Sequence, residues 1–222
     1  MTKAIVFDFD GVIADSMPLQ EACWRSAVRL IMKADGDEVE SKIIRNLYDG
    51  FAGTQMFLDV EVTDEQQGLL RRTKDEQWSK INAQTPLMAD ASMIIRELKN
   101  GFVLSIATTA ERNYVEAVLN REDLMSSFRF IATNADVSRP KPASDLVDAI
   151  VEKGNFHKNE VCVIGDSEND RLMARNADVG FVLFGEQLRV KSESDMIHLT
   201  NWKEVRKLFF GGLLNNNNAS WL

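Results

Sequence analysis

The sequence predicts an α/β protein: a doubly wound parallel sheet with a helical domain inserted after its first strand. Three observations predict this fold. A short apolar run opens the chain, residues 16–85 carry only helical periodicity, and from Pro86 onward apolar runs alternate with amphipathic segments. Such alternation is typical of a parallel sheet covered on both faces. The helical block therefore interrupts a sheet that begins with the opening run.

The opening run, KAIVFDFDG at residues 3–11, is expected to form a buried strand because it is short, rich in apolar residues and ended by polar residues and a glycine. Asp8 then stands at the carboxyl end of this strand. A spacing of two on an ideal strand points the side chains of Asp8 and Asp10 to one face and Phe9 to the other. Gly11 lets the backbone turn tightly after them.

Residues 16–85 are expected to form a separate helical domain. Apolar residues recur there at three- and four-residue spacing, which predicts helices at 19–32, 41–48 and 63–81. Thr63, followed by Gln66 three residues later, gives a capping-box start to the last of them. We expect this domain to lie over the carboxyl edge of the sheet as a lid, because parallel sheets bind their ligands at that edge.

The remainder of the chain supplies the other strands and helices of the predicted core. Strands are predicted at 102–109, 128–133, 160–167, 179–184 and 196–200. Helices are predicted at 89–100, 111–120, 142–154, 168–177 and 202–210. The predicted domains are therefore a core of residues 1–15 and 86–212, a helical domain of residues 16–85, and a flexible tail of residues 213–222.

Composition excludes several classes of function. The chain has 222 residues, 45% of them hydrophobic and 27% charged, which is typical of a globular protein and excludes disorder for most of it. Its 34 acidic and 26 basic side chains give a net charge of -8, which argues against a broad grip on nucleic acid or anionic lipid. No apolar segment reaches the roughly 18 residues that a membrane helix needs.

Cysteine and histidine are scarce, with two of each. Cys23 and Cys162 lie in no C-x-x-C motif, so neither a disulfide framework nor a cysteine zinc site is expected. This usage, and an opening run too short and too acidic for a signal peptide, predict a cytoplasmic protein. We expect Cys162 to be buried and inert, His157 to lie in a surface loop and His198 to pack in the last strand. Acid/base chemistry then falls to carboxylates.

Residues able to carry chemistry gather at the carboxyl ends of the predicted strands. They are Asp8, Asp10 and Gly11 after the first strand, Thr108 and Thr109 after the second, Lys141 after the third, and Gly165, Asp166, Ser167 and Asp170 after the fourth. Taken singly, each is more often a turn former or a surface residue. Together they suit a hard divalent cation and a phosphoryl group, because Mg²⁺ prefers oxygen ligands while an ammonium and hydroxyls neutralise phosphate oxygens.

Four ordered motifs resemble those of the haloacid dehalogenase superfamily, and specifically its phosphatases with a helical cap, such as phosphoglycolate phosphatase and β-phosphoglucomutase. The motifs are DFDGV at 8–12, Thr108 after an apolar strand, Lys141 in RPKPASDL, and GDSEND at 165–170. The resemblance covers nearly the whole chain, including the DS at 15–16 that opens the cap. It implies a Rossmann-like core with a helical cap and hydrolysis of a small phosphomonoester.

The resemblance also implies a role for each motif residue. Asp8 is expected to attack phosphorus and form an aspartyl-phosphate, a known form of covalent catalysis by a carboxylate. Asp10 is expected to protonate the leaving alcohol and then to deprotonate the attacking water. The phosphate group is expected to contact Gly11, Thr108, Thr109 and Lys141. Mg²⁺ is the implied cofactor, with the Asp8 carboxylate, the Asp10 carbonyl, Asp166 and Asp170 as its ligands.

Substrate selection falls to the predicted cap, where Gln20, Arg45, Tyr48 and Gln55 are candidates to reach the substrate. The substrate itself stays open among glycolate, sugar, nucleotide and amino-acid phosphates, and so does the oligomeric state. Cys23 and Trp24 are expected to pack against the other cap helices.

Alternative functions are distinguished by single residues. A dehalogenase has no need of Asp10, because a halide leaves without a proton. A phosphomutase of the β-phosphoglucomutase type usually carries a histidine soon after the DS motif, where this chain offers Gln20. Hydrolysis is therefore preferred, with the mutase as alternative. A non-catalytic phosphate-binding member is the alternative from another class, although every motif residue is intact. A phosphorylated receiver domain does not match the order of the motifs.

Overall fold

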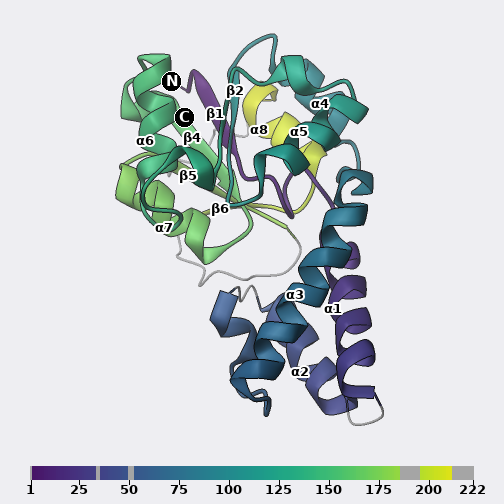
Figure 1. Cartoon of the computed structure of the whole chain (residues 1–222). Helices are drawn as coiled ribbons and strands as arrows, with labels where there is room; N and C mark the ends of the chain where they lie inside the picture. Colours follow the sequence, from purple (N-terminus) through teal and green to yellow (C-terminus); the bar gives the residue numbers. More distant parts are fainter. Residues whose placement is uncertain (1, 34–35, 50–52, 186–195, 212–222) are drawn as a thin grey trace. The chain divides into compact units, whose positions relative to one another are not determined.

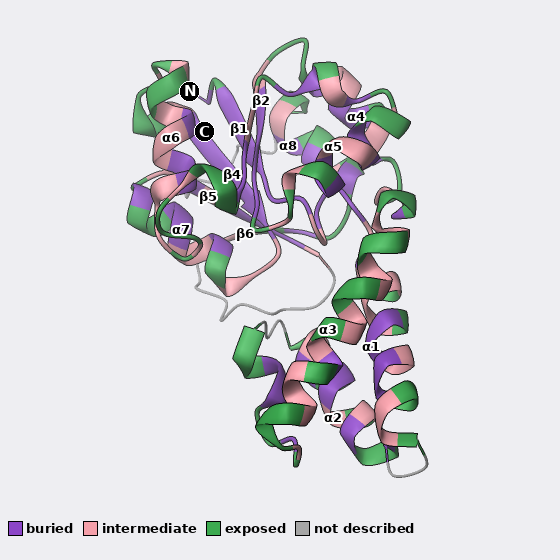
Figure 2. Ribbon diagram, viewed as in Figure 1, coloured by how far each residue is buried: buried purple, intermediate pink, exposed green. Residues whose placement is uncertain are grey.

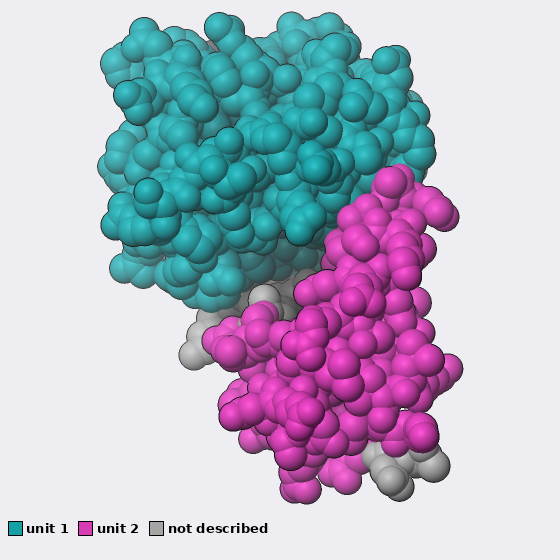
Figure 3. All heavy atoms as spheres, in the orientation of Figure 1, with its two compact units in different colours: residues 1–15, 86–222 teal, residues 16–85 magenta. Residues whose placement is uncertain are grey.

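The structure is a computed structural model that describes residues 2–33, 36–49, 53–185 and 196–211. It divides into two compact units, coloured separately in Figure 3: unit 1 is Met1–Asp15 with Pro86–Leu222, and unit 2 is Ser16–Thr85. The predicted tail, residues 213–222, lies outside the described residues. Among the helices that are described, none combines the length and apolar character needed to span a membrane.

Unit 1 is built on a sheet of six strands, all parallel, as the sequence predicts. The strands are β1 (Ala4–Phe7), β2 (Val103–Ala107), β3 (Phe130–Ala132), β4 (Val161–Gly165), β5 (Gly180–Phe184) and β6 (Ile197–Leu199). Their spatial order is β3-β2-β1-β4-β5-β6. The chain proceeds outward in one direction from β1 to β3 and in the other from β4 to β6. The β1/β4 pair is thus the switch point at which open α/β sheets bind ligands.

Helices cover both faces of this sheet (Figure 1). They are α4 (Ala91–Leu98), α5 (Arg112–Arg121), α6 (Asp145–Gly154), α7 (Glu168–Ala177) and α8 (Trp202–Phe210). On the face of α6 and α7, Val6 and Val163 of the central strands join one apolar cluster with Ile150 and Met173. On the opposite side Trp202 of α8 stacks on Phe7 with the ring centroids 5.3 Å apart. Figure 2 shows the central strands buried between these layers.

The first strand is shorter than the sequence predicts, and this changes the geometry of its motif. β1 ends at Phe7, and the backbone then turns, with Gly11 at φ +78° and the Ile13 and Ala14 N–H groups donating to the Phe9 carbonyl. Asp8 and Asp10 therefore lie beyond the strand, which contradicts the prediction that the strand extends through them. The turn, and not the alternation of a strand, decides where each carboxylate points.

The described part of unit 2 has three α-helices, α1 (Met17–Met32), α2 (Asp37–Tyr48) and α3 (Asp64–Ile81), and two 3-10 helices, η2 (Gly53–Phe57) and η3 (Asn82–Gln84). Its core is apolar and contributed by the three α-helices and η2, and includes Trp24, Ile43, Phe57 and Leu70. Cys23 and Trp24 are buried as expected, and the Trp24 ring meets the Phe57 ring edge-on at 5.9 Å. The capping box predicted at Thr63 is confirmed, since its hydroxyl accepts from the Gln66 N–H and the Gln66 side chain accepts from the Thr63 N–H.

Two of these helices begin earlier than predicted. α1 begins at Met17, with Pro18 in its first turn, where the absent N–H of proline costs no hydrogen bond. α2 begins at Asp37, four residues before the expected start, with acidic residues in its first turn. Negative charge there interacts favourably with the helix dipole. Apolar periodicity missed the first turn of α2 because Val39 is its one apolar residue.

Candidate active site

The predicted site residues of unit 1 converge on the carboxyl edge of β1 and β4. Asp8 follows Phe7 directly, and its N–H donates to the Ile164 carbonyl of β4 at 2.9 Å, so the sheet fixes its backbone. Gly11 lies against Asp166: a Cβ at this position would come within 2.2 Å of Asp166 Oδ2. Both the positive φ and the absence of a side chain are therefore required of Gly11, so that the turn after β1 can approach the loop after β4.

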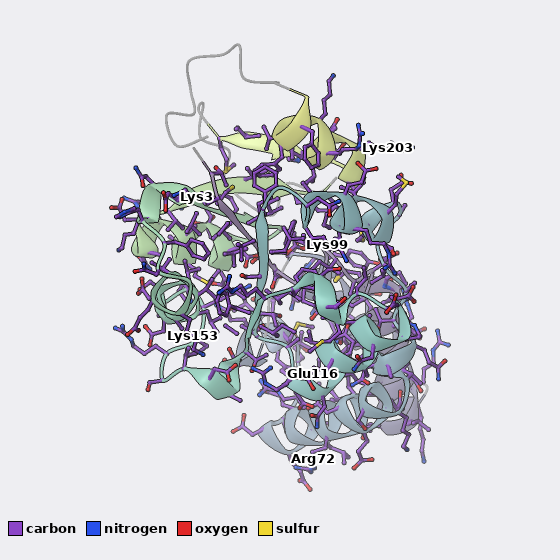
Figure 4. The ribbon with its side chains drawn as sticks, turned by 90° about the horizontal axis from the view of Figure 1, so that it is seen from above. Lys3, Arg72, Lys99, Glu116, Lys153 and Lys203 are labelled. Carbon is purple, nitrogen blue, oxygen red and sulfur yellow. The ribbon has the colours of Figure 1, made fainter. Side chains whose placement is uncertain are left out.

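Lys141 contacts both Asp8, after β1, and Asp170, at the start of α7. Its Nζ lies 2.6 Å from Asp8 Oδ1 and 2.5 Å from Asp170 Oδ1. The Lys141 side chain is 4% exposed, whereas Lys3 and Lys203, both labelled in Figure 4, have side chains that are 64% and 74% exposed. The two carboxylate partners offset the cost of burying the Lys141 ammonium, because burying a charge without partners is unfavourable.

The start of α7 fixes Asp170. Ser167 is the N-cap of this helix, and both its N–H and its hydroxyl donate to Asp170 Oδ2, at 3.1 and 2.5 Å. Gly165 makes room, since a Cβ there would lie 2.3 Å from the Asp170 Cβ. Both oxygens of the fully buried Asp170 are thus engaged, one by Lys141 and one by Ser167. Asp170 therefore orients the ammonium that contacts Asp8.

Burial sets the protonation behaviour of the site. It raises the pKa of Asp8 to about 7, against the opposing effect of the Lys141 ammonium. Burial alone lowers the pKa of Lys141, but Asp170 and Asp8 outweigh it and raise that pKa above its usual range. Lys141 therefore stays charged, while Asp8 is the group whose protonation changes near neutral pH.

The carboxylates of Asp8, Asp166 and Asp170 each offer an oxygen, and these three atoms lie within 4.8 Å of one another. Lys141 supplies one positive charge beside these three carboxyl groups, so the buried cluster has more acidic than basic groups. A divalent cation with oxygen ligands fits this donor set, since Mg²⁺ is bound by carboxylates and keeps several waters. Asp170 has partners on both oxygens and Asp8 has Lys141 on one, so a cation would share these carboxylates with groups that already contact them.

Asp10 lies beside this cluster with a different partner. Its negative charge is one of the effects that raise the pKa of Asp8, so the two carboxylates are near each other. Asp10 Oδ1 accepts a hydrogen bond of 2.9 Å from the hydroxyl of Tyr114 on α5. Phe9, between the two aspartates, is fully buried, as the sequence predicts.

Thr108 and Thr109, which are predicted to contact phosphate, directly follow β2. Thr108 is buried, its N–H donates to the Ala132 carbonyl of β3, and its hydroxyl oxygen accepts from the Ala110 N–H at 3.1 Å. This arrangement leaves the hydroxyl proton of Thr108 to donate elsewhere. The Thr109 carbonyl accepts from the side chain of Asn134, which follows β3.

The predicted substrate-selecting residues all belong to unit 2. Arg45 and Gln55 are exposed, and Gln20 is half-buried. The Tyr48 hydroxyl donates to Glu21 at 2.5 Å, and Glu21 also pairs with Arg25. Their role toward a substrate stays a prediction.

Sequence reasoning missed two supporting residues and the role of a third. Ser167 was named after the fourth strand, and its capping role was recoverable because Ser-x-x-Asp before a helix is a capping pattern. Tyr114 and Trp202 were not, since their contacts are non-local: Tyr114 is 104 positions from Asp10, and the Trp202 indole N–H donates to the Val12 carbonyl 190 positions away. Trp202 thereby ties α8 to the turn that carries Asp8 and Asp10.

Predictions for residues outside the site have mixed outcomes. Cys162 is fully buried, and burial raises the pKa of its thiol, which keeps it unreactive. His157 is exposed, as expected. The expectation that His198 packs in the last strand is wrong: β6 is an edge strand, and the exposed His198 ring instead contacts the Gly185 carbonyl at 2.7 Å.

Comparison with known proteins decides the family. The model of the haloacid dehalogenase-like hydrolase family matches residues 5–184, which include all four motifs. The chain belongs to this family. Residues 185–222, which include β6 and α8, lie beyond the matched region.

Individual relatives of the chain agree with this assignment. A phosphoglycolate phosphatase of Vibrio vulnificus is 26% identical over 190 residues, 82% of each chain. The pyrophosphatase PpaX of Bacillus velezensis is 24% identical and covers 90% of this chain and 97% of its own. Among solved structures, a haloacid dehalogenase-like family hydrolase from Streptococcus pneumoniae superposes with a TM-score of 0.78 at 20% identity, over 94% of this chain and 98% of its own.

A second solved structure, a subfamily IA hydrolase of the superfamily from Geobacter sulfurreducens, gives a TM-score of 0.72 at 21% identity and covers 93% of this chain and 96% of its own. These likenesses establish the α/β fold of the family. They leave the substrate and the chemistry of this chain to its own residues.

Proposed function

We propose that the protein is a Mg²⁺-dependent phosphatase that hydrolyses a small phosphomonoester through a phosphorylated Asp8. The observation that carries the proposal is the buried cluster in which Lys141 bridges Asp8 and Asp170 beside Asp166. Relatives named as phosphoglycolate phosphatase and pyrophosphatase support a phosphate ester or anhydride as the substrate class.

In the first step an oxygen of Asp8 attacks phosphorus. A P–O bond to Asp8 forms, the P–O bond to the alcohol breaks, and Asp10 gives its proton to the departing oxygen. Lys141 offsets the repulsion between the Asp8 carboxylate and the phosphate, and the Thr108 hydroxyl donates to a phosphate oxygen. In such transfers, electrostatic stabilisation is the main contribution of the protein.

In the second step water attacks the phosphorus of the phosphorylated Asp8. The new P–O bond to water forms as the bond to Asp8 breaks, and Asp10 takes the proton from water, which returns both aspartates to their starting states. Asp8, the Asp10 carbonyl, Asp166 and Asp170 are proposed to hold the Mg²⁺, which when bound neutralises charge on the phosphoryl group. Asp170 and Ser167 keep Lys141 oriented throughout.

Residues 16–85 are proposed to act as a cap that selects the substrate, with Gln20, Arg45, Tyr48 and Gln55 as its candidate contacts. A phosphomutase is the alternative. The composition of unit 2 favours hydrolysis, because both histidines of the chain, His157 and His198, belong to unit 1.

Turnover of p-nitrophenyl phosphate and of a panel of phosphomonoesters with Mg²⁺ tests the proposal. The wild type is expected to be active, and Asp8→Asn is expected to lose at least about 10⁴-fold in kcat, since removal of a nucleophile abolishes the covalent route. EDTA should stop turnover, and Ca²⁺ should replace Mg²⁺ poorly because its looser coordination misplaces the reacting groups. A wild type inert on every ester would favour the non-catalytic alternative.

A further inference from the structure

The hydroxyl of Tyr114 forms a hydrogen bond with Asp10 and can orient its carboxylate. It donates to Asp10 Oδ1 at 2.9 Å, and the two residues come from separate elements, α5 and the turn after β1. Tyr114 is only 4% exposed. A buried phenol needs a hydrogen-bond partner, and here that partner is a carboxylate to which the proposed function gives the proton transfers.

The ring of Tyr114 is anchored independently of its hydroxyl. It meets the ring of the fully buried Phe9 edge-on, with the centroids 5.3 Å apart and the planes at 81°. Phe9 is the neighbour of both Asp8 and Asp10 in the chain. The aromatic contact therefore fixes Tyr114 against the motif, and the hydroxyl adds one directed contact to one carboxylate oxygen.

We propose that Tyr114 is a positioning residue that holds Asp10 Oδ1 as an acceptor, so that Oδ2 is the oxygen that carries the transferred proton. This role rests on the proposed function. In the first step the proton moves from Oδ2 to the alcohol oxygen as its bond to phosphorus breaks, and in the second step a proton of water moves to Oδ2. The Tyr114 phenol keeps its own proton in both.

Substrates with an alkyl alcohol or with p-nitrophenolate as the leaving group distinguish a positioning role of Tyr114 from a merely structural one. An alkyl alcohol is a poor leaving group and needs the proton of Asp10, whereas p-nitrophenolate leaves without one. The ratio kcat/KM reports the steps up to departure of the leaving group. A variant that loses only the orientation of Asp10 is therefore slowed on alkyl phosphates and little affected on p-nitrophenyl phosphate.

The test compares wild type with Tyr114→Phe, which removes the hydroxyl and keeps the ring against Phe9. We expect kcat/KM to fall about tenfold on an alkyl phosphate that the wild type accepts, part of the 10²–10⁴-fold that general acid catalysis contributes, and to fall less than about threefold on p-nitrophenyl phosphate. The control is Ser127→Ala, which removes a buried hydroxyl with no hydrogen-bond partner in the described part of the chain. It should leave both ratios unchanged.

A second measurement tests the contact without turnover. The chain has two tyrosines, so ¹³Cζ-tyrosine labelling gives two NMR signals that single Tyr→Phe variants assign. Asp10→Ala should move the Tyr114 signal and leave that of Tyr48 in place.

Three outcomes would overturn the role of Tyr114 while leaving the proposed function intact. They are an equal loss on both esters, no loss on either ester, and a Tyr114 signal that does not respond to Asp10→Ala. A wild type that hydrolyses neither ester would instead overturn the proposed function, and the positioning role with it.

Discussion

The ion pairs of Lys141 in unit 1 differ from those of Glu40 in unit 2 in burial and in reach along the chain. In unit 1, Lys141 pairs with Asp8 and Asp170 through side chains that are at most 11% exposed, and Asp8 is 133 positions away. In unit 2, Arg25 and Arg29 pair with Glu40 through side chains of arginine that are 39% and 70% exposed. Exposed pairs contribute about 0–1 kcal/mol each to stability, whereas buried charges change the chemistry of their partners.

Both units have an apolar core, and the comparison shows that they differ in where their charged side chains lie. Unit 2 depends on an apolar core of side chains from its own helices. Unit 1 brings together carboxylates from separate strand ends, and burial raises the pKa of Asp8 among them. We therefore expect changes at these carboxylates of unit 1 to act on the chemistry, and changes in unit 2 to act on stability or on the choice of substrate.

The largest expected effect comes from removing the buried ammonium. Lys141→Met leaves Asp8 without the charge that offsets its repulsion from a phosphate, and kcat/KM should fall by about 10²–10³-fold, the size seen for loss of one electrostatic contact. Lys203→Met, which removes an exposed lysine paired with Asp90, is the control and should leave kcat/KM unchanged. Equal effects of the two variants would mean that the burial of Lys141 has no catalytic consequence.

A change in the core of unit 2 should act on stability. Leu70 is fully buried and its neighbour Leu69 is 41% exposed, both on α3. Leu70→Ala is expected to lower the free energy of unfolding by about 2–5 kcal/mol, because it leaves a cavity. Leu69→Ala should lower it by less than about 0.5 kcal/mol. Denaturant unfolding measures both, and similar values would show that the apolar cluster does not hold this unit together.

The apparent affinity for Mg²⁺ should depend on pH. Because the pKa of Asp8 is raised to about 7, its carboxyl is protonated below that pH and ionised above it. A proton then competes with the cation, so the Mg²⁺ concentration for half-maximal activity should rise about tenfold per pH unit below 7 and level off above it. Activity titrated with Mg²⁺ between pH 5 and 8 measures this. A flat dependence would exclude Asp8 as a ligand that titrates in this range.

The smallest effect on stability is expected from replacing Arg45, an exposed residue of unit 2. Arg45→Gln removes an exposed charge, so stability should change by less than about 0.5 kcal/mol. If Arg45 contacts the substrate, KM for the preferred phosphomonoester should rise, by about tenfold for one lost charged contact, with kcat on p-nitrophenyl phosphate preserved. Unchanged KM across the ester panel would remove Arg45 from the specificity residues.

Much of unit 1 was predictable because its signals are local. Buried parallel strands are continuous apolar runs, and their order in the chain with an insertion after the first predicts a sheet whose carboxyl edge collects Asp8, Lys141 and Asp166. The pairing of Lys141 with Asp8 does not follow from topology alone, because Lys141 lies in the loop beyond β3. The position of Asp10 did not follow, because the strand ends at Phe7 and a turn takes over.

The contacts of Tyr114 and Trp202 could not be predicted from the sequence for a different reason. Each makes its contact with the turn after β1 from a helix far along the chain, and nothing in the local sequence of α5 or α8 marks the residue that faces inward toward that turn. In unit 2, apolar periodicity predicted three helices but gave no sign of η2. It also carries no information on which surface side chains meet a ligand.

The most direct test of the central claim is to trap the phosphorylated enzyme. Asp10→Asn removes the group that activates water but leaves Asp8 able to accept a phosphoryl group from p-nitrophenyl phosphate, whose leaving group needs no proton. After an acid quench, mass spectrometry of the digested protein should find a phosphoryl adduct on the peptide that contains Asp8, dependent on Mg²⁺ and absent from a variant that also carries Asp8→Asn. Release of p-nitrophenol without any adduct, or an adduct on another residue, would contradict Asp8 as the nucleophile.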